Sequence, residues 1–486
     1  MFSIYNHLIV GLPKPQTLAL GHLAFSHHLS HSLASLSIPL DTHSVTDPHC
    51  SPQYLPKFVD LSNCSNLPQL NQNFAHIIRT HLLHLYPAPF HWNNILRAYT
   101  RLDAPNKALH IYASMCRSGV LPDSYTLPIS VKAASQLFAV GTGRQLHSVA
   151  IKVGLELNEF CESGFISLYS KSGEFGDAHK VFDGNPSRKL GSWNAIIAGL
   201  CHAGRAKEAI NMFIEMRKRG FQPDDVTMVS VTSACGSLGD LDLAIQLHKY
   251  VFYARTSEKP DILMMNSVID MYGKCGRMDL ACSVFSSMTQ KNVSSWTSLI
   301  VSYGMHGHTD EAIQCFESMM KAGVRPNYVT FIGVLSACVH GGKVQEGRYY
   351  FESMKSVHKI VPQLQHYGCM VDLYGRVGLL QEARRVVEAM PMKANVVIWG
   401  SLMGACEKYG DVKMGKWVAL NMLELQPWND GVYVALSNIF ASRGLWEEVE
   451  RVRELLKQRR LAKVPAYSLA TPQNFRTFHQ KAQLLF

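Results

Sequence analysis

The stretch WNAIIAGLCHAGRAKEAINMFIEM, residues 193–216, decides the fold class of this 486-residue chain. Its first half carries apolar side chains at the spacing of one helical face, namely Trp193, Ile196, Ile197 and Leu200. Its second half repeats that pattern with Ala209, Ile210, Met212, Phe213 and Met216. Ser192 is expected to cap the first helix, Gly204 to end it, and Gly220 and Pro223 to end the second. One such helix pair cannot bury its own apolar faces, so it must stack on neighbours.

The same helix pair returns with a period of about one hundred residues. Trp92, Trp193, Trp296 and Trp399 are separated by 101, 103 and 103 residues. Two further series keep this period, with glycines at 119, 220 and 323 and tyrosines at 169, 272 and 374, and a Leu-His pair at 146–147 recurs at 247–248. Each period divides into three units, each of which is expected to form two helices. The sequence therefore predicts an all-α fold, a right-handed α-solenoid of tandem helix-turn-helix repeats.

The amino-acid composition limits the kinds of partner that the protein is expected to bind. Hydrophobic residues make up 47% of the chain, which excludes wholesale disorder. The 47 Lys and Arg exceed the 37 Asp and Glu, giving a net charge of +10 that fits a polyanion without establishing one. No run reaches the roughly 18 apolar residues of a membrane-spanning helix, so no membrane partner is expected.

The sequence contains no pattern that indicates catalysis. Its twelve cysteines form no C-x-x-C pair and no metal-ligand spacing with histidine, so most are expected to be buried thiols in a reducing compartment. The H-x-E and C-x-x-C motifs of zinc-dependent nucleobase deaminases are missing, and the residues at 141–146 do not match a dinucleotide-binding motif. The prediction is a protein without catalytic residues, metal, cofactor or small-molecule substrate.

The first fifty residues differ from the rest. They contain many serines, a single lysine and no acidic residue before Asp41. This composition is typical of an organellar transit peptide, with a disordered tail as the alternative. Residues 1–50 are therefore expected to direct import, and their composition does not separate mitochondrion from plastid.

The quoted motifs resemble the pentatricopeptide repeat family. The alternation of unit lengths resembles its plant subfamily, in which P-, L- and S-type units take turns. By this resemblance nine repeats span 89–395: P-type units 89–123, 190–224 and 293–327, L-type units 124–158, 225–261 and 328–363, and S-type units 159–189, 262–292 and 364–395. A degenerate unit precedes them at 54–88, an E-type extension follows at 396–468, and a tail covers 469–486. The resemblance points to a mitochondrial member, with a plastid as the alternative.

The resemblance also implies that two side chains per reading unit contact one base of single-stranded RNA. The pairs Asn93/Asp123 and Asn194/Asp224 imply U, Asn266/Asn292 implies C, and Thr297/Asn327 implies A. Ser163 with Lys189, and Gly368 with Asn395, occupy the same places without a pair that can be decoded. L-type units receive no base, so the expected footprint is U-x-x-U-x-C-A-x-x from 5′ to 3′.

Donor and acceptor chemistry supports this assignment. An Asp carboxylate accepts from the ring N–H of uracil or guanine, whereas an Asn amide can donate to the bare ring nitrogen of cytosine or adenine. Asp123 and Asp224 follow proline at a helix start, where capping alone explains an aspartate. Because a carboxylate has two oxygens, both roles can coexist. Two residues before the tryptophan-type position, Phe90 and Leu263 offer stacking surface, while Gly191 and Ser294 offer little.

The expected function is recognition of sites in organellar RNA for C-to-U editing, with the deaminase supplied in trans by a partner of an editing complex. One alternative is RNA splicing or stabilisation, which needs no recruited deaminase. A second alternative, from another class, is a tetratricopeptide-like scaffold that binds protein.

Overall fold

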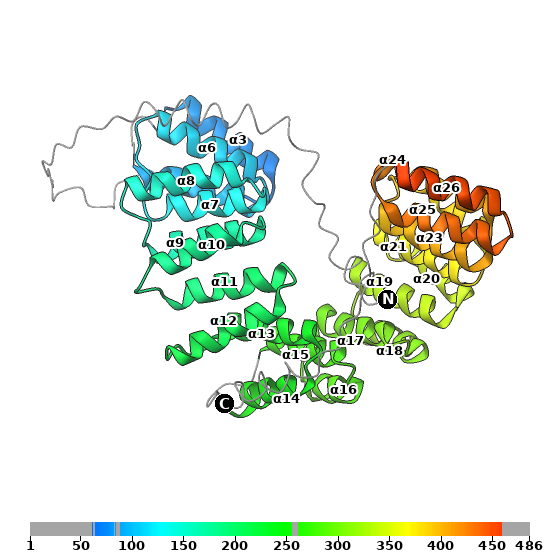
Figure 1. Ribbon diagram of the computed structural model, residues 1–486. Coiled ribbons are helices and arrows are strands. Elements are labelled where there is room, and N and C mark those ends of the chain that lie inside the picture. The colour runs from blue at the N-terminus through cyan, green and yellow to red at the C-terminus, as the bar shows by residue number, and fades with distance from the viewer. Residues whose placement is uncertain (1–60, 62–63, 82, 84–87, 255–260, 459–486) are drawn as a thin grey trace, which may run out of the picture. The chain divides into compact units, whose positions relative to one another are not determined.

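The computed structural model describes residues 61, 64–81, 83, 88–254 and 261–458, and the regular elements of these residues are helices (Figure 1). The expected import segment 1–50, parts of the leading unit and of the E-type extension, and the tail 469–486 lie outside the described residues. The predicted all-α repeat solenoid is confirmed. The chain divides into two compact units, one ending at Ala234 and the other beginning at Cys235, within one helix.

The first unit consists of helix pairs. They are α3 (Leu67–Arg79), α5 (Pro89–Arg101), α6 (Pro105–Arg117), α7 (Thr126–Gln136), α8 (Val140–Lys152), α9 (Glu159–Lys171), α10 (Phe175–Gly184), α11 (Leu190–His202), α12 (Ala206–Lys218) and the first part of α13 (Asp225–Leu238). From α5 to α9 the first helix of each pair packs on its own partner and on the first helix of the next pair, as α9 does on α10 and α11.

The second unit continues the pattern. Its helices are α14 (Leu241–Lys249) with a π-helical turn (Tyr250–Ala254), α15 (Ile262–Lys274), α16 (Met278–Ser287), α17 (Val293–Met305), α18 (Thr309–Lys321), α19 (Tyr328–Gly341), α20 (Val344–Ser356), α21 (Leu364–Arg376), α22 (Leu380–Ala389), α23 (Val396–Tyr409), α24 (Val412–Leu425), α25 (Asp430–Ser442) and α26 (Trp446–Gln458). Helices α15, α17, α19, α21 and α23 pack successively against one another.

The repeat tryptophans belong to the core, as expected. Trp193 is 0% exposed and meets the Phe182 ring edge-on, with centroids 4.7 Å apart. Trp92 and Trp399 are also buried, and Trp296 is half-buried. Burying a large apolar side chain stabilises the fold by about 1.5–3 kcal/mol. Stacking of helix pairs therefore provides the apolar burial that a single pair lacks.

Glycines with a positive φ occupy the turns that end the helices. Gly220 adopts a φ of +84° directly after α12, and Gly204 a φ of +73° after α11, so both helices end where the sequence predicts. The expectation for Ser192 is wrong. Because α11 begins at Leu190 with Lys189 at the N-cap, Ser192 lies inside the first turn, and its buried hydroxyl has no hydrogen-bond partner among the described residues.

The recurring Leu-His pair also has a structural role. His147 Nδ1 lies 3.1 Å from the hydroxyl of Tyr169, and His248 Nδ1 lies 2.8 Å from that of Tyr272. Burial lowers the pKa of both histidines, which favours the neutral ring. Each histidine thus joins the second helix of one repeat to the first helix of the repeat that follows.

Candidate nucleic-acid interface

The first predicted pair forms a direct contact. Asn93 lies in the first turns of α5, and Asp123 lies just before α7. The amide Nδ2 of Asn93 donates to Asp123 Oδ1 at 3.0 Å and to Oδ2 at 3.2 Å. Helix stacking therefore brings together two side chains that are thirty residues apart in the chain.

The two oxygens of Asp123 have different partners. Oδ1 accepts from the backbone N–H groups of Tyr125 at 2.9 Å and Thr126 at 2.8 Å, and from the Thr126 hydroxyl at 2.9 Å. Oδ2 accepts only from Asn93 among the described residues. A carboxylate oxygen can accept two hydrogen bonds, so Oδ1 caps the helix while Oδ2 keeps capacity for a further donor.

The second P-type junction repeats this geometry. Asn194 Nδ2 donates to both oxygens of Asp224 at 3.0 Å. Asp224 Oδ1 also accepts from the backbone N–H and the hydroxyl of Thr227, each at 2.8 Å. The Thr227 hydroxyl is 2.5 Å from Asn194 Oδ1, so the orientation of the Asn194 amide is fixed from both ends.

The hydrogen bonds around Asp123 also affect its charge. Burial raises the pKa of this carboxyl group, but the bonds from Thr126, Tyr125 and Asn93 outweigh burial, and the net shift is downward from 3.8. Asp123 is therefore held as a carboxylate, which accepts hydrogen bonds and donates none.

The predicted pair of the second S-type unit is also in contact, with an amide in place of the carboxylate. Asn292 Oδ1 accepts from the Ser295 backbone N–H at 3.0 Å, the Ser295 hydroxyl at 3.1 Å and Asn266 Nδ2 at 3.2 Å. Since capping turns the oxygen toward the helix, the amide Nδ2 faces away from it. Within the described residues this nitrogen has no partner.

Thr297 and Asn327 are joined indirectly. Asn327 Oδ1 caps α19 by accepting from the Thr330 backbone N–H and hydroxyl, both at 3.0 Å. The Thr297 hydroxyl lies 2.7 Å from the Thr330 hydroxyl. Thr330 therefore connects the two predicted residues, and Asn327 Nδ2 again has no partner in the described part of the chain.

The structure does not connect the two remaining predicted pairs. The Ser163 hydroxyl donates to the Glu159 carbonyl at 2.8 Å inside α9, and Lys189 is exposed at the start of α11. Gly368 has no side chain and is buried in α21, while Asn395 caps α23 by accepting from the Ile398 N–H at 3.0 Å.

Burial separates the two members of three of the four pairs. Asn93 is 4% exposed, and Asn266 and Thr297 are 7% exposed, whereas Asp123 and Asn327 are half-buried and Asn292 is exposed. In the fourth pair Asn194 and Asp224 are both half-buried. In the first three pairs a ligand from solvent therefore meets the closing residue, which is the second member of the pair, before it meets the residue on the preceding helix.

Large apolar side chains are exposed near these pairs. Phe90 is 62% exposed and Leu263 is 61% exposed, as a stacking role requires. The same place in other units carries further exposed side chains that sequence reasoning did not single out, namely Tyr125, Phe160 and Val226. Exposed aromatic rings provide stacking surface for unpaired bases.

Sequence reasoning also missed the hydroxyl that completes each pair. It belongs to the third residue after the closing position, at Thr126, Thr227, Ser295 and Thr330. The spacing is that of a capping box, which was the available signal. At Asn395 the equivalent residue is Ile398, which has no hydroxyl.

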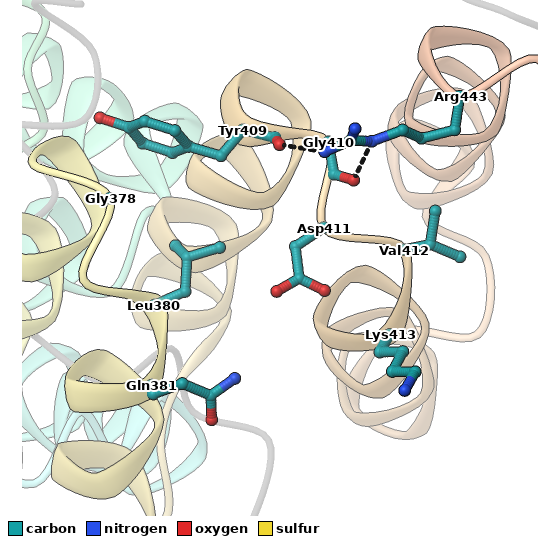
Figure 2. Close-up of a pocket in the computed structure, with 9 residues that line it drawn as sticks. All are labelled: Gly378, Leu380, Gln381, Tyr409, Gly410, Asp411, Val412, Lys413 and Arg443. Atoms are coloured by element: carbon teal, nitrogen blue, oxygen red, sulfur yellow. Dashed lines mark hydrogen bonds between the residues drawn. The ribbon is translucent and has the colours of Figure 1, made fainter.

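Residues around the loop between α23 and α24 line an open pocket of about 470 Å³ (Figure 2). Arg443 donates to the Gly410 carbonyl at 2.7 Å and to the Tyr409 carbonyl at 2.9 Å, as the dashed lines in Figure 2 indicate. Asp411 caps α24 through the Met414 N–H at 3.0 Å. These hydrogen bonds complete helix ends.

The described residues contain no group of three or more His, Cys, Asp or Glu side chains arranged to hold a metal ion. None of their helices is both long enough and apolar enough to span a bilayer.

Comparison with known proteins identifies the family. Models of the PPR repeat match residues 188–237 and 291–340 and, in a second form, 90–120, 263–293, 329–357 and 366–393. A pentatricopeptide repeat-containing protein of Arabidopsis thaliana, At1g77170, mitochondrial, is 55% identical over 469 residues, which covers 96% of this chain and 99% of the relative. The chain belongs to the pentatricopeptide repeat family. An E motif model matches residues 409–470, so this member also carries an E-type extension.

Other pentatricopeptide repeat proteins are more distant. A chloroplastic Arabidopsis thaliana relative, At1g08070, is 40% identical over 354 residues, covering 73% of this chain and 48% of the relative. The structure of maize PPR10 in complex with an 18-nt psaJ RNA element shares the fold with a TM-score of 0.55 at 16% identity, covering 81% of this chain and 64% of PPR10. The near-full-length mitochondrial relative confirms the predicted mitochondrial localisation over the plastid alternative.

Proposed function

We propose that this protein reads single-stranded RNA from mitochondrial transcripts, one base per reading unit. The observation that carries the proposal is that the second residue of each pair has two polar atoms with different roles. One polar atom caps the next helix, and the other keeps hydrogen-bonding capacity toward solvent. Maize PPR10, which shares the fold, has been crystallised with an RNA element.

Capping determines which chemistry each unit offers. At Asp123 and Asp224 the remaining atom is an acceptor oxygen, which suits the ring N–H of U. At Asn292 and Asn327 the oxygen is used for capping, so the remaining atom is a donor nitrogen that suits C or A. The choice between U and G, and between C and A, is the one that the family resemblance implies, which gives the proposed footprint U-x-x-U-x-C-A-x-x.

The partners on the preceding helices orient the closing residues. Asn93 and Asn194 donate to the oxygens that would meet the base, so no existing contact has to break when a ring N–H approaches. Phe90 and Leu263 add exposed stacking surface, whereas Gly191 and Ser294 add little. Because the stacking surface differs from one reading unit to the next, we expect a modest overall affinity for RNA.

For the biological role we propose site recognition for C-to-U editing, with catalysis supplied in trans by a deaminase or another editing-complex protein. The E motif at 409–470 and the missing deaminase motifs of the sequence support this role. Residues 1–50 are proposed to direct mitochondrial import. Splicing or stabilisation of a transcript uses the same RNA contacts and is the alternative role.

The first experiment is RNA binding by the purified full-length chain. Fluorescence anisotropy with an RNA carrying U-x-x-U-x-C-A should give an affinity that falls as salt rises, because phosphate contacts release counterions. Scrambled RNA and duplex RNA of equal length are the controls. Equal binding to all three, or no binding at low salt, would favour the protein-binding scaffold.

The second experiment separates editing from the other RNA roles. Mitochondrial transcripts from plants that lack the protein are sequenced and compared with wild type. Loss of C-to-U conversion downstream of a matching footprint supports the editing role. Complete editing together with an unspliced or depleted transcript would replace it with the splicing or stabilisation role.

A further inference from the structure

Two repeats lack a residue pair that can be decoded, and in both of them a lysine lies in the segment that leads to the next first helix. Lys189 directly precedes α11, after the repeat of α9 and α10. Lys393 lies shortly before α23, after the repeat of α21 and α22. Both lysines are exposed, and among the described residues neither ammonium group has a hydrogen bond or an ion pair.

Lys189 occupies the place of a capping residue without capping. It is the N-cap of α11, as Asn292 is of α17, but its side chain accepts no hydrogen bond from the helix. On the preceding helix the Ser163 hydroxyl donates to the Glu159 carbonyl, so it does not hold the lysine either. A positive charge on a flexible side chain therefore stands where Asn292 presents an oriented amide.

Basic residues at the place of Lys393 are bound within the protein in two other repeats. Arg188 donates to the backbone carbonyl three residues before it at 3.0 Å, and its guanidinium lies 4.3 Å from the centroid of the Phe182 ring. Lys291 also donates to the carbonyl three residues before it, at 2.6 Å, and lies 5.1 Å from the centroid of the Phe285 ring. In both repeats the cation is held against an aromatic ring of the second helix.

The sequence explains why Lys393 is not bound in this way. Phe182 and Phe285 lie six positions before their basic residues, and the residue six positions before Lys393 is Val387. A valine side chain has no ring face that attracts a cation. The ammonium group of Lys393 therefore stays available to a ligand from solvent.

We propose that Lys189 and Lys393 bind phosphate groups of the RNA backbone, so that their repeats hold the strand without reading a base. This inference rests on the proposed function, and it assigns a contact to the third and ninth positions of the footprint. A lysine ammonium binds phosphate as a point charge and needs no fixed orientation. Base reading uses groups held in one orientation, as the Asp224 carboxylate is, and neither lysine is held.

The test is the salt dependence of RNA binding by the full-length chain. Lys189→Gln and Lys393→Gln remove the charge but keep a hydrogen-bond donor. For a single strand, each phosphate contact contributes about 0.7 to the slope of log affinity against log salt, so each variant should reduce the slope by about that amount. Lys189→Arg keeps the charge and should keep the wild-type slope.

The matched control is Lys180→Gln, which removes one charge from α10 of the same repeat as Lys189. The Lys180 side chain is 80% exposed and pairs with Asp177, which keeps Arg144 as a partner in the variant. The control should keep the wild-type slope. If it reduces the slope as much as Lys189→Gln does, net charge rather than a contact explains the effect, and the proposal is wrong.

Four RNAs that differ only at the third footprint base distinguish a phosphate contact from a base contact. Lys189→Gln should weaken the binding of all four by the same factor. A loss confined to one base would overturn the proposal and assign Lys189 to base reading.

The failure of this inference differs from the failure of the proposed function. If wild type prefers the footprint RNA over scrambled RNA but a lysine variant keeps the wild-type slope, that lysine does not bind phosphate and the proposed function stands. If wild type binds no RNA at low salt, both the proposed function and this inference are wrong.

Discussion

Two helix junctions have a similar capping residue but differ in the side chains next to it. After α12, Asp224 caps α13 and is held by Asn194 from α11 and by the Thr227 hydroxyl. Before α23, Asn395 makes the same kind of cap, but the position behind it is Gly368 and the third residue on is Ile398. At the first junction the capping residue belongs to a network of side-chain hydrogen bonds, and at the second it makes only the capping bond.

The comparison shows that a capping residue does not by itself make a reading site. The Asn395 amide is held by one hydrogen bond, from the Ile398 N–H, whereas the Asp224 carboxylate accepts hydrogen bonds on both oxygens. A group held in one orientation discriminates between donors and acceptors at lower entropic cost than a mobile one. We therefore expect the Asp224 junction to be the more stable and the more selective of the two.

The largest effect on stability is expected when each of the two capping residues is removed in a variant of its own. Asp224→Ala removes the capping bonds and leaves the amide of Asn194 without its acceptor, for a predicted loss of about 2–3 kcal/mol in the free energy of unfolding. Asn395→Ala removes one capping bond, for a loss of about 1 kcal/mol. Urea unfolding of the two variants measures the difference, and equal losses would contradict a network at the first junction.

The hydroxyl that joins the network is the second target. Thr227→Val keeps the shape of the side chain but removes the donor to Asn194 Oδ1, for an expected loss of about 1–2 kcal/mol in unfolding free energy. Thr232→Val is the matched control, because its buried hydroxyl donates only to the Val229 carbonyl within the same helix. The control is expected to lose less than Thr227→Val, because removing its hydroxyl deprives no side chain on another helix of a donor. An equal loss there would remove the distinction.

A smaller effect is expected from pH at the equivalent Asp123 junction. Since the folded pKa of Asp123 lies below its ordinary value of 3.8, its charged form stabilises the fold above that value, and this stabilisation is lost as pH falls through the folded pKa. The stability advantage of wild type over Asp123→Asn should therefore shrink below about pH 4. The difference between wild type and Asn395→Ala should not change with pH, because an amide does not titrate in this range.

The smallest effect is expected at the cap without a network. Asn395→Asp should change the RNA preference by less than about 0.5 kcal/mol, since neither Gly368 nor Ile398 holds the new carboxylate in place. Competition binding with RNAs that differ at one base measures this. A clear shift toward U at one position would mean that capping alone is enough for reading.

Much of the fold could be predicted because its signals are local and repeated. The tryptophan series and the apolar spacing of residues 193–216 predict two helices per unit, and the Pro-Asp sequences before α7 and α13 predict capping carboxylates. Ser192 shows where local reasoning fails, because several polar residues near a helix start compete for one cap. Packing settled the start at Leu190.

The site could be predicted only in part. The resemblance to the repeat family paired Asn93 with Asp123 and Asn194 with Asp224, and in the structure both pairs are hydrogen-bonded. The burial of Asn93 and the bridging role of Thr330 could not be predicted, because both depend on how closely neighbouring helices pack. Thr297 and Asn327 share a junction without touching, which spacing alone does not reveal.

The most direct test of the account exchanges donor for acceptor at one closing residue. Asp224→Asn keeps the cap and the size of the side chain but replaces the acceptor Oδ2 with a donor. Asp411→Asn makes the same exchange at a cap outside the reading units and is the matched control. The account predicts that Asp224→Asn moves the preference at one RNA position from U to C by about 1–3 kcal/mol, as for base readout in DNA, while the control leaves it unchanged. An unchanged preference in the Asp224→Asn variant, with wild-type RNA affinity, would contradict it.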